Sequence, residues 1–431
     1  MLKFPLRSSV SIAVFLATMV AAALMFGAYA ARYAVARELI DTDKPERAVW
    51  AVRLDPRNAL VQNRTGFLYQ WQTAGTSKAL PYLQRATELN PRVAAYWNDL
   101  ANGCELAGQL ECARSAYEKA VALAPMHPGF IWGLANYFLR VGENEKALDG
   151  FARYLRLVPS AREETFGLVS RGVHDPMLIW EKVVHVSRDP ETELAYLDFC
   201  KKRDAQADTL PLWTEVMAEG KPFSASAAIP YVDRLLDNLE YDQAKQVWAD
   251  LQSKGLISAK QPAGELVFNG SFDEKPLNGG FDWRLHEQSY LYLDVARPSS
   301  CQEDSCLYVN FTVPQNLEYE PAYEIIPVKP HQLYSLSANV RSQDITSDSG
   351  PRLKVVDPQC AACLSVMTPQ VVETRAWHKV EVTFMTGAHT QVIKLSVFRP
   401  RSRVFPMEIN GEFWLNSVSI KLAGGAITPA S

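Results

Sequence analysis

The sequence predicts a multidomain chain that mixes α and β structure. The expected order is an N-terminal transmembrane helix, an α-solenoid of helical hairpins and a C-terminal β-sandwich of the jelly-roll type. Three observations predict it: an uncharged N-terminal segment, prolines that recur about every 34 residues, and a period-two apolar alternation from residue 265 onward. The expected boundaries are 1–35 for the anchor or signal segment, 36–160 for regular repeats, 161–260 for an irregular helical extension ending in a degenerate repeat, and 265–422 for the sandwich.

The N-terminal segment 8–31 carries no charge and is flanked by Lys3, Arg7 and Arg32. About 20 helical residues cross the hydrocarbon core of a bilayer, so the segment is long enough for one transmembrane helix. A cleaved secretory signal is the alternative, because Ala28-Tyr29-Ala30 has the pattern of a cleavage site. The expected location is a bacterial inner membrane, single-pass, with the bulk of the chain in the periplasm, or secretion if the segment is cleaved.

Pro56, Pro91, Pro125 and Pro159 lie 35, 34 and 34 residues apart. About 34 residues is the length of one helix-turn-helix repeat, which buries its apolar face only by stacking on copies of itself. The units that end at Pro125 and Pro159 carry similar residues at equivalent positions. The pairs are Trp97 with Ile131, Leu100 with Leu134, Ala101 with Ala135, Gly108 with Gly142, Ala113 with Ala147, and Tyr117 with Phe151.

This pattern resembles the tetratricopeptide repeat (TPR) family. The resemblance implies small residues where paired helices cross, a glycine in the turn between them, and a proline that ends the second helix. It also implies that a protein partner binds along the concave face of the solenoid. Before Pro56 the sequence supplies one expected second helix, with Ala48 and Ala51 facing inward.

Seven cysteines, six of them in close pairs, are typical of an exported protein with small disulfide loops. Zinc and a thioredoxin-like redox role are the alternatives for the Cys-x-x-Cys pair. A four-ligand zinc site needs a second such pair, and a redox motif needs a strand followed by a helix. Cys200 is left over and expected to be buried or idle. The expected disulfides join Cys104 with Cys112, Cys301 with Cys306, and Cys360 with Cys363.

The composition gives no sign of nucleic-acid binding, because the net charge is −4 and both signs are interspersed. The sequence contains no G-x-S-x-G, H-E-x-x-H, P-loop or G-x-G-x-x-G motif, so no catalytic residue is predicted. We therefore expect a protein that is not an enzyme. An unrecognised envelope enzyme, such as a glycoside hydrolase, stays open, because two carboxylates can converge in a fold without any local motif.

Nine short segments, from Leu266–Asn269 to Gly411–Lys421, alternate apolar and polar residues between Gly, Pro, Asn and Asp clusters, which is typical of a β-sandwich or jelly roll. The opening Val267–Asp273, followed by Trp283, and the closing Phe413–Ile420 resemble the galactose-binding-like jelly rolls of carbohydrate-binding modules.

That second resemblance implies two ligands. One is a structural calcium ion near the first and last strands, for which Asp273, Glu274 and Asn416 are the candidates. The other is a glycan, held by aromatic rings and polar groups. Tyr290 and Tyr292 are expected to share one face of a strand, and Trp414 is expected in the core. The predicted glycan-binding residues are Trp283, Tyr290, Tyr292, Tyr319 and Arg341.

These features together predict a non-catalytic, membrane-anchored scaffold. It binds a protein partner through its solenoid and glycan through its jelly roll, in cell-envelope or exopolysaccharide assembly. The alternative is a pure protein-interaction scaffold in which the β-sandwich is structural.

Overall fold

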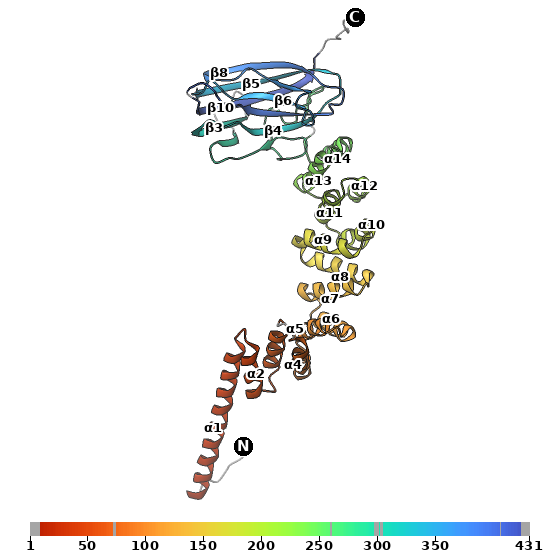
Figure 1. The fold of residues 1–431 in the computed structure, drawn as a ribbon, viewed down its shortest axis with the longest axis vertical. Helices are drawn as coiled ribbons and strands as arrows, with labels where there is room; N and C mark the ends of the chain where they lie inside the picture. The colour runs from red at the N-terminus through yellow and green to blue at the C-terminus, as the bar shows by residue number, and fades with distance from the viewer. Residues whose placement is uncertain are drawn as a thin grey trace. The chain divides into compact units, whose positions relative to one another are not determined.

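The computed structural model describes residues 9–71, 75–258, 261–296, 301, 305–405 and 407–423. The chain divides into two compact units, Met1–Arg188 and Asp189–Ser431, which are described separately. The described part of the first unit is helical, and the second unit holds helices followed by two antiparallel sheets (Figure 1). An α-solenoid followed by a β-sandwich is the fold class that the sequence predicts.

The helices of the first unit follow one another in hairpins joined by short turns. After α9, the unit ends in short helical turns over residues 176–187. The helices are α1 (Ser9–Ile40), α2 (Pro45–Leu54), α3 (Ala59–Gln70), α4 (Thr76–Leu89), α5 (Ala94–Leu106), α6 (Leu110–Leu123), α7 (Pro128–Arg140), α8 (Asn144–Leu157), α9 (Arg162–Gly172) and α10 (Pro176–Ile179).

The predicted repeat is confirmed in the hairpins α3–α4, α5–α6 and α7–α8. Their second helices each end two residues before a repeating proline, which cannot continue a helix. Ala113 and Ala147 are fully buried where the paired helices pack. Gly108 and Gly142 have φ of +73° and +81°, a left-handed conformation that glycine adopts without strain.

The helix α1 runs without interruption from an apolar stretch into the solenoid. It is long and apolar enough to cross a membrane, and none of its most apolar stretch is buried. At its C-terminal end, Ala36 and Ile40 are buried against Ala48 and Ala51 of α2 and Val61 of α3. The end of α1 is therefore the first helix of a hairpin whose second helix is α2. The sequence indicated only that second helix.

Three disulfides join the predicted partners: Cys104 with Cys112, Cys301 with Cys306, and Cys360 with Cys363. Cys200 is buried and unbonded, and burial raises the pKa of its thiol to about 11. Each paired cysteine is bonded to the next cysteine in the sequence. The Cys-x-x-Cys pair, Cys360 and Cys363, therefore forms a disulfide loop. Three such loops are what an oxidising compartment favours.

The second unit begins with α11 (Pro190–Arg203), α12 (Leu210–Glu219), α13 (Ala225–Asp237) and α14 (Tyr241–Ser253). Two five-stranded antiparallel sheets follow, with strand orders β1-β4-β9-β6-β7 and β2-β3-β10-β5-β8. The strands are β1 (Arg284–Leu285), β2 (Tyr292–Ala296), β3 (Cys306–Gln315), β4 (Tyr319–Pro327), β5 (Leu333–Ile345), β6 (Arg352–Val356), β7 (Ser365–Met367), β8 (Glu373–Met385), β9 (Val392–Arg399) and β10 (Ile409–Leu422).

The predicted strand Leu266–Asn269 is wrong. This segment forms turns, and Asn269 and Phe272 adopt left-handed φ values of +52° and +57° that an extended strand does not allow. The segment bonds to two strands without pairing along either: Leu266 donates its N–H to the carbonyl of Ile420 in β10, and Phe268 donates its N–H to the Glu324 side chain of β4. The segment adds no strand, and its Val267 side chain packs into the core between the two sheets.

The helices α13 and α14 pack directly on the sandwich within the second unit. Asp233 of α13 accepts the backbone N–H of Gly280 at 2.7 Å and pairs with the guanidinium of Arg284 at 2.5 Å. A Cβ on Gly280 would lie 2.2 Å from the Trp248 ring of α14, so only glycine allows this approach. Trp248 also meets Phe268 edge-on, with ring centroids 5.2 Å apart. These contacts fix the last hairpin against the β domain.

Candidate functional site

The strand β10 presents alternate residues to the two faces of its sheet. Phe413 and Leu415 lie in the core between the sheets, so Trp414, the residue between them, lies on the outer face. Trp414 is buried, as expected, but it is not part of the core cluster between the two sheets. It is only 3% exposed because Tyr308 and Arg341 cover its ring.

An aromatic row crosses this outer face of the sheet β2-β3-β10-β5-β8. Trp414 pairs with Tyr308 of β3 and with Arg341 of β5 in the strand register. Its ring centroid lies 5.4 Å from that of Tyr308, and the Arg341 guanidinium carbon lies 4.5 Å above it. Tyr308 in turn lies 6.1 Å from Tyr292 of β2. We call these four residues the aromatic row.

Polar groups flank the aromatic row and hold its hydroxyls. The Tyr308 hydroxyl donates to Glu412, and the Tyr292 hydroxyl donates to Asp294 at 3.0 Å. Burial, followed by the Glu412 carboxylate, raises the pKa of Tyr308 to about 12, and the bond to Asp294 raises the pKa of Tyr292. Both hydroxyls therefore stay protonated near neutral pH. Tyr292 is 53% exposed, so its ring is open to a ligand.

Two of the five residues predicted to bind glycan, Tyr292 and Arg341, belong to the aromatic row. Trp283 is fully buried and Tyr319 is 6% exposed, and both lie in the core between the sheets. Tyr290 is half-buried against that core, with its ring 5.9 Å from Tyr319. Tyr290 and Tyr292 do not share a face, because β2 begins only at Tyr292 and Tyr290 lies in the turn before it.

The sequence reasoning missed Tyr308, and it expected the burial of Trp414 but not its place on the outer face of the sheet. A signal for Tyr308 was present, because it stands between Leu307 and Val309, which are both fully buried. Once one member of such an alternation is assigned to the core, its neighbours face outward.

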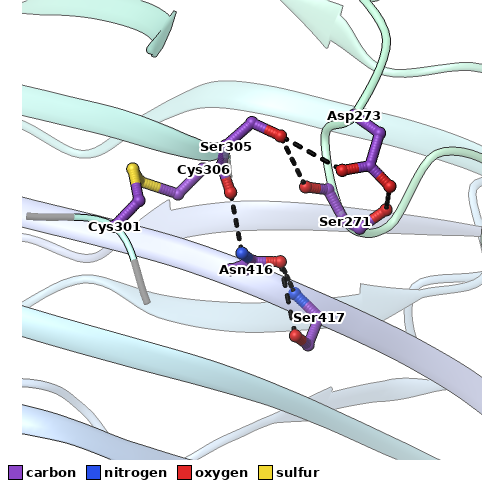
Figure 2. The surroundings of a disulfide bond; sticks show 7 residues. All are labelled: Ser271, Asp273, Cys301, Ser305, Cys306, Asn416 and Ser417. Carbon is purple, nitrogen blue, oxygen red and sulfur yellow. Dashed lines mark hydrogen bonds between the residues drawn. A yellow bond between two sulfur atoms is a disulfide. The ribbon is translucent and has the colours of Figure 1, made fainter. Parts of the chain in front are cut away.

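Two of the three calcium candidates, Asp273 and Asn416, lie near the Cys301–Cys306 disulfide, and each forms a hydrogen bond with Ser305 (Figure 2). The Asn416 amide donates to the Ser305 carbonyl at 2.7 Å and accepts the N–H of Ser417. The Ser305 hydroxyl donates to Asp273 at 3.2 Å, and the second Asp273 oxygen accepts the Ser271 hydroxyl at 2.6 Å.

This donor set does not fit a calcium ion, which needs six to eight hard oxygen ligands. Among the seven residues shown in Figure 2, Asp273 is the one that carries a carboxylate. Both of its oxygens accept hydrogen bonds from serine hydroxyls. Asn416 is fully buried and commits both amide atoms to neighbours. Glu274 is exposed, and its backbone bonds to the side chain of Asn269. Closed hydrogen bonds hold this site together.

A chelator is therefore expected to leave the thermal unfolding midpoint of the full chain unchanged, whereas Asn416→Ala is expected to lower the free energy of unfolding by about 1–3 kcal/mol. The variant leaves a buried carbonyl and a buried N–H without partners. Calorimetry with EDTA, and separately with added calcium, checks the first part. A midpoint that rises with calcium and falls again with EDTA would restore the calcium site.

Comparison with known proteins concerns the two parts of the chain separately. No family profile and no curated protein sequence matches the chain. Among solved structures, a crystal structure of MamA is similar to the helical part, with 16% identity over 41% of this chain and 97% of MamA, at a TM-score of 0.32. A thermophilic TPR protein of Thermus thermophilus shares 22% identity over 30% of this chain and 70% of its own, at 0.27. A CBM4 structure is similar to the sheet region, with 13% identity over 36% of this chain and 99% of its own, at 0.27.

Proposed function

We propose that this protein is a membrane-anchored, non-catalytic scaffold that binds a glycan on the aromatic row of its sandwich and a protein partner along its solenoid. Cell-envelope or exopolysaccharide assembly is the setting that such a pairing suits. The proposal places α1 in a bacterial inner membrane, with the bulk of the chain in the periplasm. The apolar α1 and the three disulfides support an exported chain.

The observation that carries the glycan proposal is the aromatic row itself. A sugar ring presents apolar C–H faces that pack on aromatic rings, and its hydroxyls need fixed donors and acceptors. Tyr292 and Tyr308 offer ring surface, while Glu412, Asp294 and Gln343 stand beside them. Gln343 accepts a hydrogen bond from Arg341 at 3.4 Å, so the guanidinium links the stacked ring to a polar neighbour. A sandwich that served only as a spacer has no need for this arrangement.

The solenoid supports a protein partner because stacked repeats create an extended surface. The repeats are fixed to one another by contacts that leave that surface rigid. Arg140 of α7 pairs with Glu105 of α5, with nitrogen–oxygen distances of 2.5 and 2.8 Å. The Tyr137 hydroxyl of α7 donates to the carbonyl of Leu110 at 2.8 Å. A preordered surface loses little conformational entropy when a partner binds.

Tyr308→Ala is expected to weaken glycan binding by the full chain about tenfold or more, because it removes the stacking surface of the central tyrosine and the hydroxyl that bonds to Glu412. A glycan array of the full chain in detergent first identifies the strongest binder. Titration calorimetry with that glycan then compares wild type and variant.

Met367→Ala is the matched control, because Met367 is 38% exposed on β7, an edge strand of the other sheet. Its affinity is expected to equal that of the wild type. An array without any retained glycan would remove the glycan proposal and leave a pure protein-interaction scaffold. Equal losses in both variants would place the glycan elsewhere.

A further inference from the structure

In the membrane-anchored arrangement proposed above, α1 places the start of the solenoid directly at a bilayer surface. Residues 12–31 carry no charge, and about 20 helical residues span the roughly 30 Å of a hydrocarbon core. Arg32 is the first charged residue after this stretch. Four residues later Ala36 is already buried in the first hairpin, so no linker separates the membrane helix from the solenoid.

A groove of about 790 Å³ lies at the depth of Arg32. Its walls are the end of the apolar stretch of α1, the turn between α2 and α3, and the turn between α4 and α5. The polar and aromatic residues that line it are Tyr29, Arg32, Tyr33, Asp55, Arg57, Asn58, Asn90 and Tyr96. Tyr29 is 66% exposed, so the groove opens beside the lipid-facing side of α1.

The turn between α2 and α3 lies beside Arg32 of α1. The Arg32 guanidinium donates to the carbonyl of Leu54, the last residue of α2, with Nε 3.1 Å from the oxygen. Arg57 follows in that turn and is exposed, and none of the described residues forms an ion pair with it. Trp50 of α2 is 57% exposed, with the Arg53 guanidinium 4.4 Å over its ring. Tryptophan, tyrosine and arginine are the residues that gather at membrane interfaces.

The charges that line the groove favour an anion. Arg32 and Arg57 are permanently positive, and the one acidic lining residue, Asp55, accepts the Asn58 amide at 2.9 Å. Guanidinium groups bind phosphate through charge-assisted hydrogen bonds, and tyrosine hydroxyls add further donors. The adjacent exposed surface of α1 is apolar and suits an acyl chain.

We propose that this groove binds the head group of an anionic phospholipid, with Arg32 and Arg57 as its phosphate ligands and the acyl chains along α1. The inference rests on the membrane anchoring proposed above. Insertion of α1 requires only the hydrocarbon core of a bilayer. The proposal adds that one class of lipid binds specifically beside this helix. The bound lipid ties the first repeat turn to the bilayer surface.

Native mass spectrometry of the full chain, released from detergent micelles, tests the proposal. The intact mass is measured first, because a chain that begins after residue 30 would remove the membrane premise without any lipid measurement. The chain is then incubated with phosphatidylglycerol, with phosphatidylcholine, or with inorganic phosphate. We expect one phosphatidylglycerol to survive collisional activation that strips phosphatidylcholine.

Arg57→Gln is expected to lower the occupancy of that phosphatidylglycerol about tenfold, because it removes a charge-assisted phosphate contact. Arg92→Gln is the matched control, since Arg92 follows Pro91 in the next repeat turn, is exposed, and does not line the groove. Equal losses in both variants would show binding by general surface charge and overturn the proposal. Equal retention of both lipids, or displacement of the lipid by equimolar inorganic phosphate, would also overturn it.

Discussion

Replacing Arg399 with methionine is expected to lower the free energy of unfolding of the sandwich by about 4 kcal/mol or more. Arg399 ends β9 and is fully buried. Its guanidinium makes five hydrogen bonds to neutral acceptors: the carbonyls of Ser349, Leu317 and Met407 at 3.0, 2.6 and 2.8 Å, and the side chains of Asn316 and Ser347 at 3.3 and 3.2 Å.

These acceptors belong to three different loops, so one side chain joins the turns β3–β4, β5–β6 and β9–β10 at one end of the sandwich. Burial lowers the pKa of Arg399, yet a guanidinium stays protonated at any physiological pH. Methionine fills a similar volume but removes the hydrogen bonds to three carbonyls, of which that of Ser349 is buried and those of Leu317 and Met407 are partly buried. Lysine cannot replace Arg399, because its single ammonium group cannot reach all five acceptors, which lie around the plane of the guanidinium.

Urea unfolding of the full chain, combined with hydrogen exchange of the three loops, measures the Arg399→Met effect. Arg401→Met is the control, because Arg401 is exposed two residues further along the same loop. It is expected to change the free energy of unfolding by no more than about 0.5 kcal/mol. A loss below about 1 kcal/mol for Arg399→Met, or unchanged exchange in the β3–β4 turn, would refute the role assigned to Arg399.

Glu324→Gln is expected to flatten the pH dependence of stability and to favour the folded chain above neutral pH. Glu324 of β4 is 1% exposed, and one of its oxygens accepts the N–H of Phe268 at 2.7 Å. Its other oxygen has no hydrogen-bond partner among the described residues. Burial, and then the nearby carboxylates of Asp282 and Glu265, raise the pKa of Glu324 well above its usual range.

Asp282 shares this environment, and burial raises its pKa to about 6. Carboxyl groups in an unfolded chain titrate near pH 4. Between about pH 4 and the raised values, the unfolded chain releases protons that the folded chain keeps, so the free energy of unfolding falls as the pH rises. For Asp282 alone this loss amounts to about 3 kcal/mol by pH 7.

Glutamine at position 324 keeps an acceptor for the Phe268 N–H and removes the charge. Calorimetry between pH 4.5 and 8 is expected to show a decline in the unfolding free energy that is smaller than in the wild type by at least about 1 kcal/mol. Glu318→Gln, at an exposed carboxylate, is expected to leave the slope unchanged. A slope equal to that of the wild type in Glu324→Gln would mean that Glu324 is already ionised in the folded chain.

The helical part was predictable because its signals are local. Helix ends, glycine turns and small crossing residues repeat within about 34 residues, and Trp97 and Ile131 do occupy the same fourth position of α5 and α7. The disulfides were predictable for the same reason, since each partner lies within eight residues of the other. The continuation of α1 into the first hairpin was less visible, because the apolar run of the candidate membrane span continues without a break into the residues that pack at Ala36.

The sandwich site was predicted only in part, because alternation reveals two faces without saying which is inside. Phe413, Trp414 and Leu415 are all large and apolar, and only the pairing of β10 with β3 and β5 decides that Trp414 faces outward. The burial of Arg399 depends on acceptors more than 80 residues earlier in the chain, such as Leu317 at a separation of 82. No local pattern carries such long-range information.

The unbroken course of α1 has a mechanical consequence. A transmembrane helix adjusts its tilt when the thickness of the bilayer changes. In the membrane-anchored arrangement proposed above, Ala36 and Ile40 are packed into the first hairpin, so a change in the tilt of α1 rotates that hairpin with it. In that arrangement the composition of the surrounding lipid sets the angle at which the first repeat projects from the membrane.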